Sequence, residues 1–498
     1  MLTQQSGSGP DAIEGALAAD RLGAPSVVYF VLSAAAPLTV VAGVVTTAYA
    51  VTGITGLPIA FLAVGAVLAL FSVGYVAMGR RIANAGAFYA YVTRGLGRPS
   101  GIAAAWIALI AYNALQVGLY GAFGAATVPL VQQWAGLSVP WWVLALVSWL
   151  LVAVLGLMRV DVNGRLLAVL LTAEVAVILL FDAADLLNPA GGAISMAALS
   201  PGELLAPGAG ALLVIATTGF VGFESSVVFS EESRDPRRTV PAATYASVGI
   251  IAVLYALSSW ALTVAAGPGD VVRLAREGQA ETIFILAEGH LGGTVVEIAR
   301  VLFVTSLLAA MISFHNTTAR YFFALGRERV LPGAFGRTGP RTGAPKVGSL
   351  TQSALGVIVI VIFASLGLDP LVNLFFYGGT FGGFGILLLI TATSVSVIAY
   401  FARDPGAESR WRRVVAPVIA TFALATMVIL ALANFSTLLG VPPESPLRWI
   451  LPSIYAVAVV LGLLWALVLR SGRPAVYERI GMGARAVTAT PSAHGGRR

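Results

Sequence analysis

Two carboxylates lie within apolar stretches of the chain, where a charged group is costly. Glu174 is flanked by Leu170, Leu171 and Val175, and Glu224 follows an apolar segment that contains two glycines. On insertion scales, a carboxylate at the centre of a membrane helix costs roughly 2.5–3.5 kcal/mol. We therefore predict that Glu174 and Glu224 serve in coupling or gating. The alternatives are a structural hydrogen bond for Glu224 and a position near the membrane interface for Glu174.

The glycines before Glu224 predict a broken helix. Gly219 and Gly222 weaken the helix at the depth of the carboxylate. Irregular backbone inside a membrane is tolerated only where protein buries it or where it lines a cavity. We therefore predict a small-molecule site around this break, with the two phenylalanines either covering the pocket or only packing, formed by Thr217, Thr218, Gly219, Phe220 and Phe223.

A second break is expected near the amino terminus, between Ser33 and Pro37. Proline lacks an N–H donor, and its ring prevents the helical hydrogen bond to the residue four before it, here Ser33. The N–H groups of Ala34, Ala35 and Ala36 should then have no partner in their own helix, and such amides form an anion site. The alternative is a simple kink whose amides bond neighbouring helices.

The composition indicates the surroundings of these residues. Of 498 residues, 58% are hydrophobic and 11% are charged, whereas soluble domains carry about 25% charged residues. Apolar runs of about 20 residues, the length that crosses the hydrocarbon, recur along the chain, without the short alternating segments of a β-barrel. We predict an all-α membrane protein with about twelve transmembrane helices, at residues 27–51, 56–79, 99–128, 139–158, 165–187, 207–230, 241–267, 295–325, 348–367, 370–401, 413–436 and 447–470.

The two expected breaks fall in the first and sixth runs, five helices apart. Secondary transporters are often inverted repeats whose first helices are both interrupted near the midplane. We therefore predict one transmembrane domain over residues 25–470, with repeats at 25–187 and 207–401 and two extra helices at 413–470. The polar ends, residues 1–24 and 471–498, are predicted to be disordered.

Positive charges gather in alternate loops between the predicted helices. Arginines are frequent after the second, fourth, sixth, eighth and tenth runs, whereas the intervening loops hold Arg273, Arg276 and Arg448. This positive-inside pattern places both termini in the cytoplasm of a cell-membrane protein. The formal net charge of +7 therefore reflects topology, and we expect no nucleic-acid partner.

The sequence gives little support for catalysis or metal binding. The chain has no cysteine, which excludes disulfides and thiol catalysis. Its three histidines, His290, His315 and His494, are too far apart for a metal motif. We predict no metal, no cofactor and no catalytic residue. His315 is expected to be a structural histidine, and Arg300 is expected to pair with Glu297.

Shorter elements are predicted at both membrane surfaces. Residues 87–94 are amphipathic and fit an interfacial helix on the cytoplasmic side. Residues 268–294 fit short helices that lie over the outer face. Asp182 and Asp185 are expected to mark the outer end of the fifth helix.

Several of these stretches together carry a resemblance to a known family. Residues 219–224 are similar to an F-x-G-F-E core, and residues 232–241 are similar to an E-x-x-x-P-x-R-x-x-P loop. Residues 85–91 and 319–327 are similar to further family segments. Over about residues 25–470, the chain thus resembles the amino acid–polyamine–organocation transporters of the amino acid permease type.

The resemblance implies a five-plus-five inverted-repeat fold, alternating access and proton coupling. It also implies that the amides of residues 34–36 hold a substrate carboxylate and that the carbonyls of residues 217–220 take its amino group. Two positions depart from the family. The first break has alanines before Pro37 where the family is usually glycine-rich, and Glu174 stands where many members place a lysine in the space of a sodium ion.

Our interpretation is a proton-coupled secondary transporter in the lipid bilayer that imports an amino acid or a related amine. A sodium-coupled symporter with Glu174 as an ion ligand, an exchanger, and a non-transporting receptor or scaffold are the alternatives. An intramembrane enzyme has no nucleophile–base pair to support it. The identity of the substrate and the oligomeric state are left open.

Overall fold

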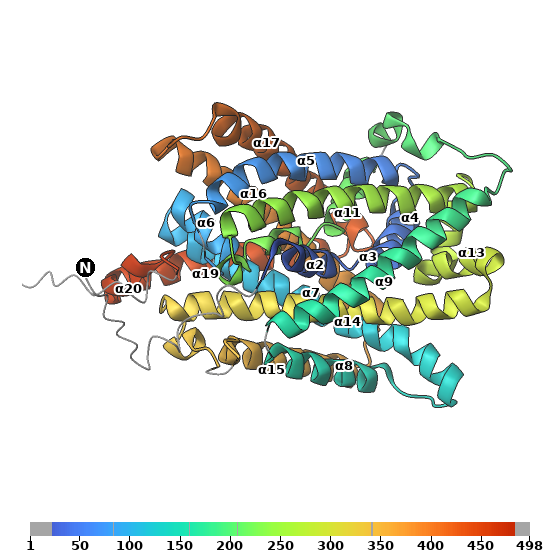
Figure 1. Cartoon of the computed structure of the whole chain (residues 1–498), viewed down its shortest axis with the longest axis horizontal. Helices are drawn as coiled ribbons and strands as arrows, with labels where there is room; N and C mark the ends of the chain where they lie inside the picture. The colour runs from blue at the N-terminus through green and yellow to red at the C-terminus, as the bar shows by residue number, and fades with distance from the viewer. Residues whose placement is uncertain (1–21, 83, 159, 207, 340–341, 484–498) are drawn as a thin grey trace, which may run out of the picture.

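The structure is a computed structural model that describes residues 22–82, 84–158, 160–206, 208–339 and 342–483, except for the side chains of residues 160–166. The described residues form helices and no β-strand; an isolated bridge joins Leu22 to Ser233. Most of the long helices run along the longest axis of the molecule (Figure 1). The predicted all-α fold is confirmed.

Within the described residues, eleven helical segments are long and apolar enough to cross a membrane. The first consists of α2 (Ala24–Ala35), α3 (Pro37–Thr39), the π-helical turn η1 (Val40–Val45) and α4 (Thr46–Thr52). The others are α5 (Leu57–Gly79), α7 (Arg98–Ala135), α9 (Val160–Leu187), α10 (Ala209–Thr218) with η4 (Phe223–Ser226) and η5 (Ser230–Glu232), α11 (Pro236–Ala266), α14 (Gly293–Arg327), α15 (Lys346–Ser365), η8 (Pro370–Phe376) with α16 (Tyr377–Arg403), η9 (Trp411–Val415) with α17 (Ala416–Ala433), and α19 (Leu447–Gly472).

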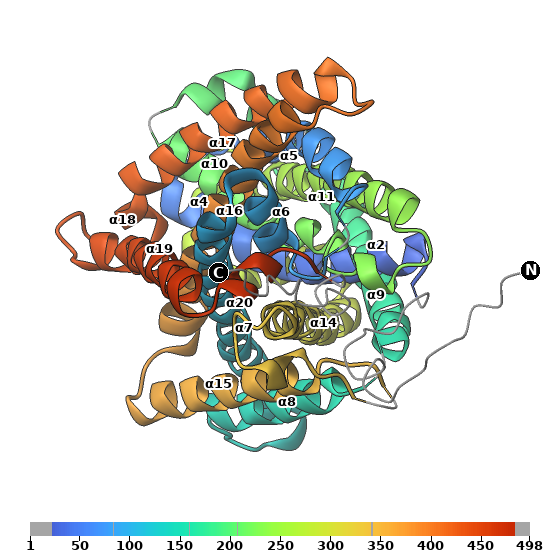
Figure 2. The same ribbon diagram turned by 90° about the vertical axis from the view of Figure 1, so that its left-hand side faces the viewer.

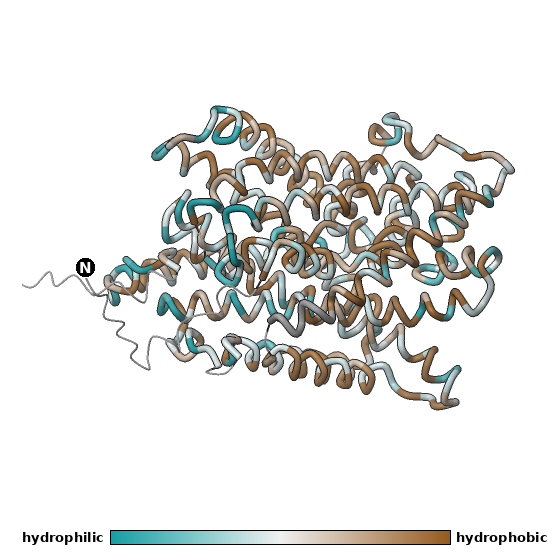
Figure 3. The backbone as a smooth tube through the Cα atoms, in the orientation of Figure 1, coloured by the Kyte–Doolittle hydropathy of each residue, from teal (hydrophilic) through white to brown (hydrophobic). Residues whose placement is uncertain are grey.

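The twelfth predicted run forms a shorter apolar helix, α8 (Trp141–Gly156). Apolar residues cover the middle of the bundle, and polar residues gather toward its two ends (Figure 3). Large hydrophobic side chains such as Phe422 on α17 and Trp449 on α19 are exposed. An exposed apolar surface of this extent fits lipid, because lipid tails are as apolar as the side chains that face them. The chain is a multi-pass membrane protein.

Both ends of the described chain lie on one side of the bundle, which we call the terminal side (Figures 1 and 2). The opposite side, which we call the loop side, carries α12 (Val271–Gly278) and α13 (Thr282–Leu291). These two helices match the short helices predicted for residues 268–294. The expected ion pair between Arg300 and Glu297 also forms, at 3.7 Å.

Two predictions for the terminal side are wrong. Helix α6 (Ala87–Leu96) does not lie on the surface: Tyr89 and Tyr91 are fully buried, and the helix packs against α7 and α16. Aromatic side chains on both faces of a short helix favour this buried position over an interfacial one. The expected disorder of residues 471–498 also fails for its first part, because α20 (Pro474–Arg479) and the residues up to Gly483 dock on the bundle.

A buried carboxylate explains why this tail docks. Glu328, just after the end of α14, accepts hydrogen bonds from the N–H groups of Gly481 (2.6 Å) and Gly483 (2.7 Å). It also accepts hydrogen bonds from the Asn84 amide and the Tyr89 hydroxyl. Burial raises the pKa of Glu328 above its ordinary value, although these donors oppose the shift.

The amino-terminal end is also more ordered than predicted. Leu22 is buried, its N–H donates to the Glu232 carbonyl, and its carbonyl accepts from the N–H of Arg234 (both 3.0 Å). Backbone pairing with a neighbouring loop supplies the order that the polar composition did not suggest. The rest of the two ends, residues 1–21 and 484–498, lies outside the described residues, as does Arg159.

Candidate functional site

The first break lies where the sequence places it, but its backbone differs from the prediction. Helix α2 continues to Ala35, and the Ala36 N–H donates to the carbonyls of Leu32 (3.1 Å) and Ser33 (3.2 Å). Ala36 then takes a left-handed conformation, with φ of +45°. The expectation that residues 34–36 have unsatisfied N–H groups is therefore wrong.

The physical reason is the position of the proline. Pro37 is the first residue of α3, where its missing N–H removes no helical hydrogen bond. The amide at the start of this second helix piece is that of Leu38, and it donates to the Glu174 carboxylate at 3.4 Å. The first amide after the break is thus already hydrogen-bonded to a side chain of the protein.

The second break follows α10. After Thr218 the chain makes tight turns in which the N–H groups of Phe220 and Val221 donate to the carbonyls of Thr217 (3.0 Å) and Thr218 (3.2 Å). A carbonyl oxygen accepts two hydrogen bonds, so these carbonyls retain capacity for a ligand. The turn ends at Gly222, which has a left-handed conformation with φ of +112°. Glycine suits this position because any other residue would be strained in that conformation.

The two breaks touch at one point. A Cβ atom placed on Gly222 would lie 2.6 Å from the Cβ of Ala34. Likewise, a Cβ on Gly219 would lie 3.2 Å from a methyl carbon of Val40, beyond the first break. The structure therefore brings the two breaks to the same depth, as expected for helices that share one site.

A cavity of about 120 Å³ lies between the two breaks. Four of the predicted substrate-binding residues line it: Ala34, Ala35, Ala36 and Thr218. The other lining residues are Thr39, Val40, Gly43, Val44, Thr47, Leu115, Leu119, Val214, Ile215, Val221, Ala310, Phe314, Phe375, Phe376, Gly379, Thr380, Phe384 and Leu438. None of these side chains is charged, and threonine hydroxyls are the polar groups among them.

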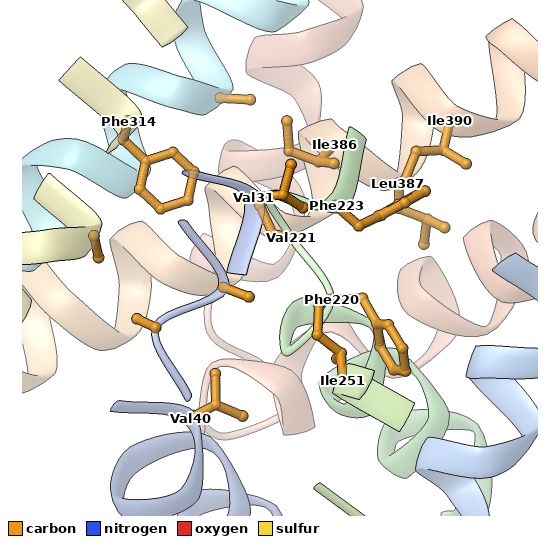
Figure 4. Close-up of a cluster of buried hydrophobic side chains, with 14 of the residues drawn as sticks. Val31, Val40, Phe220, Val221, Phe223, Ile251, Phe314, Ile386, Leu387 and Ile390 are labelled. Carbon is orange, nitrogen blue, oxygen red and sulfur yellow. The ribbon is translucent and has the colours of Figure 1, made fainter. Parts of the chain in front are cut away.

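The remaining predicted substrate residues lie beside the cavity and do not line it. Ser33 is buried in α2, and Thr217 and Gly219 are buried on either side of Thr218 in the chain but are not among the lining residues. Phe220 and Phe223 lie in an apolar cluster (Figure 4), packed on Phe61 and Phe71 with ring centroids 6.3 and 6.1 Å apart. They therefore correspond to the packing alternative.

Other aromatic residues line the cavity. Phe314 comes from α14, Phe375 and Phe376 from η8, and Phe384 from α16. The sequence signal was weak: Phe375 and Phe376 precede the glycine-rich start of the tenth span, at a position that no motif marks. Packing of η8 and α16 against α7 brings Phe375, Phe376 and Phe384 to the breaks, and packing of α14 against α2 and α3 brings Phe314 there.

Glu224 lies on the terminal side of the second break and is fully buried. Its Oε1 accepts from the Tyr112 hydroxyl at 2.7 Å, and its Oε2 accepts from the Gly222 N–H at 2.9 Å. The Tyr75 hydroxyl donates to its backbone carbonyl at 2.8 Å. Glu224 therefore joins η4 to α5 and α7 and does not line the cavity.

Glu174 lies between the first, fifth and eighth spans. Its Oε2 accepts from the Ser306 hydroxyl at 2.9 Å and from the Leu38 N–H. The Thr39 hydroxyl in turn donates to Ser306 at 3.2 Å. The side chain is buried, so it forms the centre of an oxygen-rich group behind the first break.

Ion pairs close the terminal side below Glu224. Arg320 pairs with Glu232 in a bidentate geometry, at 2.6 and 2.9 Å, and Arg327 pairs with Glu231 at 2.7 Å. The Arg320 and Glu232 side chains are only 2% exposed, so the pair is shielded from water. Nearby, Phe30 of α2 stacks on Phe229, with centroids 4.6 Å apart.

Histidine 315 serves packing, as the sequence suggested. Its Nε2 lies 2.8 Å from the Ser349 hydroxyl on α15. Gly156 lies so close that a Cβ there would overlap the His315 ring. The residue therefore joins α14 to α8 and α15, away from the cavity.

Comparison with known proteins agrees with this architecture. The chain is 31% identical to the cationic amino acid transporter 7, chloroplastic, of Arabidopsis thaliana over 164 residues, 32% of this chain and 26% of that protein. It is 22% identical to the low-affinity putrescine importer PlaP of Escherichia coli K12 over 340 residues, 66% of this chain and 70% of that protein. It is 23% identical to the glutamate/serine transporter AimA of Bacillus subtilis over 175 residues, 33% of this chain and 32% of that protein.

The alignments with the plant and Bacillus proteins therefore span about a quarter to a third of those chains. The family profile covers far more: the profile named amino acid permease matches residues 26–479. That match includes both breaks, the cavity and the ion pairs. The chain belongs to the amino acid permease family of membrane transporters.

Proposed function

We propose that this protein imports a zwitterionic amino acid with a small or medium-sized apolar side chain, by alternating access and in symport with protons. The observation that carries the proposal is the cavity at the two breaks, which has no charged lining residue. It offers backbone groups and threonine hydroxyls for the charged ends of an amino acid, and aliphatic and aromatic side chains for the rest.

The uncharged lining discriminates among the substrates that the relatives' names suggest. A diamine such as putrescine carries two ammonium groups, and a cationic or acidic amino acid carries a charged side chain. A buried charge needs a charged or strongly hydrogen-bonding partner. Glu174 and Glu224 lie outside the lining, so a neutral side chain fits the cavity best.

The backbone supplies partners for the two ends of the substrate. The carbonyl of Thr218, which lines the cavity and has one acceptor position used, suits the ammonium group. The N–H of Thr39, which lines the cavity in the first turn after the first break, suits the carboxylate, because helix N-termini favour anions and the Leu38 N–H is already bonded to Glu174. The shared depth of the breaks supports this arrangement, in which one molecule spans both helix pieces.

The orientation follows from charge. The terminal side carries Arg81, Arg94, Arg98 and Arg403, which bond to the tail or to neighbouring loops there. By the positive-inside rule this side is cytoplasmic, in a plasma membrane. The cavity then extends outward, since Val44, Thr47 and Leu438 line its far end, while the ion pairs of Arg320 and Arg327 close the cytoplasmic route.

Proton coupling is assigned to Glu174. An ionised carboxylate there needs a cation or a proton, and the described residues form no ion pair with it. Protonation would let the carboxylate release Leu38 and loosen the first break. The second candidate is sodium symport, because the hydroxyl groups of Thr39 and Ser306 and the carboxylate of Glu174 lie in one cluster.

A screen with purified protein tests the substrate. Ligands that bind the folded state raise its melting temperature, so L-leucine and L-alanine should stabilise the protein more than putrescine, L-lysine or L-glutamate. Counterflow of labelled L-leucine in liposomes then separates a transporter from a non-transporting receptor. Stabilisation by putrescine alone, or binding without counterflow, would overturn the proposal.

The coupling ion is tested in the same liposomes. With a proton gradient and no sodium, labelled L-leucine should accumulate. Accumulation that requires sodium and ignores the proton gradient would favour the second candidate.

A further inference from the structure

Helix α9 carries two more carboxylates on the face that bears Glu174. Asp182 follows Glu174 by eight residues and Asp185 by eleven, which keeps all three on one side of a helix. Asp182 is 4% exposed and Asp185 is 7% exposed. The sequence suggested a polar helix end at these positions, but neighbouring helices cover both side chains.

A small cavity adjoins these two aspartates. It is lined by Asp182, Asp185 and Ser258, and by apolar residues that include Leu38 and Ile178. The Ser258 hydroxyl donates to Asp182 Oδ2 at 2.9 Å, whereas Asp185 Oδ1 has no hydrogen-bond partner among the described residues. The cavity has room for about one water molecule. An unpaired, buried carboxylate oxygen beside such a space indicates a bound species.

The cavity reaches the proposed coupling residue through Leu38. The side chain of Leu38 lines the cavity, and its N–H donates to Glu174. Ile178 lies one turn from Glu174 and one turn from Asp182. At the other end, Asp185 lies in the last turn of α9, and Leu187 beyond it is exposed on the loop side.

No cation in the described part of the chain pairs with either aspartate. From α14, Arg300 lies over the ring of Phe284, which contacts Phe181 beside Asp182, but Arg300 pairs with Glu281 at 3.0 Å and with Glu297. From α11, Tyr255 donates its hydroxyl to the Ala35 carbonyl at 3.1 Å. Helix α13 carries Glu288 and His290, which are both exposed, and α3 carries no titratable side chain.

We propose that Asp182, Asp185 and Ser258 form a proton-binding site that supplies Glu174 from the loop side. This inference rests on the proposed function, in which Glu174 is the coupling residue and the loop side faces outward. Two neighbouring carboxylates without a cation favour one shared proton, because one proton removes the repulsion between two buried negative charges. The site thus holds a proton before the first break moves.

The proton moves in steps from the outer solution to Asp185, then to Asp182 and finally to Glu174. A hydronium ion gives its proton to the Asp185 carboxylate, which leaves a neutral carboxyl group and a water molecule. A water molecule in the cavity would take this proton from Asp185 and give one to Asp182, which leaves Asp185 ionised again. Glu174 lies about 12 Å further along the helix, at 1.5 Å per residue, so the last transfer needs water to enter past Leu38 when α3 shifts.

Infrared difference spectra of the full-length protein in lipid test the site directly. Between about pH 5 and pH 8, a neutral carboxyl group shows a C=O band that its ionised form lacks. Asp182→Asn and Asp185→Asn should each remove part of this band, and Glu174→Gln should leave that part in place. A band unchanged in both aspartate variants would overturn the proposal. If Asp182→Asn does not fold, Ser258→Ala should shift the same band by removing its donor.

Uptake of labelled L-leucine into liposomes gives a second readout. In Asp185→Asn, the external pH at half-maximal uptake should move by about one pH unit from the wild-type value. Glu288→Gln, an exposed carboxylate on the same side, is the control and should match the wild type. If the aspartate variants change a sodium requirement instead, the site binds a metal cation and the proton assignment is wrong. If no variant and no wild type transports, the proposed function fails, and the infrared result still decides the site.

Discussion

Glu174 and Glu224 are both buried carboxylates beside a broken helix, yet the protein holds them differently. Glu224 has a donor on each oxygen, from Tyr112 and from its own turn at Gly222. Both hydrogen bonds that reach Glu174 go to the same oxygen, Oε2. A carboxylate with both oxygens satisfied is fixed by the fold, whereas one held through a single oxygen can exchange its partner. The second break is therefore the anchored one, and the first break is the adjustable one.

The largest expected effect tests the anchoring around the second break. Arg320→Met leaves Glu232 buried without its partner, and breaking a buried pair in this way costs about 3–5 kcal/mol of unfolding free energy. The double variant Arg320→Met with Glu232→Met should recover most of that loss. Thermal unfolding of the detergent-purified protein measures both. Equal stability of the single variant and the wild type would show that the ion pair between Arg320 and Glu232 does not anchor the second break.

The next effect compares the two carboxylates directly. Glu224→Ala leaves the Tyr112 hydroxyl and the Gly222 N–H without a partner, at about 1–3 kcal/mol for each buried donor. Glu174→Ala should cost less, because Ser306 can turn its hydroxyl to Thr39, 3.2 Å away. A lower melting temperature for Glu174→Ala than for Glu224→Ala would show that Glu174 is held more firmly than Glu224, against this prediction. Glu224→Gln, which keeps an acceptor, should retain the fold and change how uptake depends on pH.

Glu174→Gln should have a small effect on stability and a large effect on coupling. The amide keeps an acceptor for Ser306, so we expect a change within about 1 kcal/mol. It carries no exchangeable charge, so proton-driven accumulation should be lost while exchange of labelled substrate continues. Accumulation equal to that of the wild type would contradict the role of Glu174.

The smallest expected effect concerns Glu328, a third buried carboxylate, which lies just after the end of α14. Like Glu224, it has hydrogen-bond donors on both oxygens. Burial raises the pKa of Glu328 in the folded state, so this carboxyl group binds a proton more readily when the tail covers it than when the tail leaves it open to water. Docking of residues 474–483 should therefore be strongest below about pH 4.5 and weaken as the pH rises through the raised value. Hydrogen exchange of this segment against pH measures the effect, and Glu328→Gln should show none of it.

Much of this structure was predictable from the sequence because bilayer thickness fixes helix length. The twelve apolar runs, the two breaks and the position of Glu174 follow from hydropathy, proline, glycine and the family motifs. The exact amides at the first break did not follow, because Pro37 can lie inside a helix or begin one, and only the conformation of Ala36 distinguishes the two cases.

The residues that sequence reasoning missed depend on contacts between distant segments. Asp182 and Asp185 look like a polar helix end until α11 and α13 cover them. Phe314 and Phe376 reach the cavity only through the packing of α14 and η8. The tail looks disordered by composition, and it docks because Glu328, more than 150 residues earlier, offers acceptors to Gly481 and Gly483.

The contact between Ala34 and Gly222 limits how this sequence can change over evolution. A Cβ on Gly222 would meet the Ala34 methyl at 2.6 Å, so the crossing of the two breaks has space for a single methyl group. A substitution at either position therefore constrains which residues the other can accept. A larger side chain at either one would push the two broken helices apart. Exchanging the two residues is no solution, since only position 222 has the backbone conformation that requires glycine.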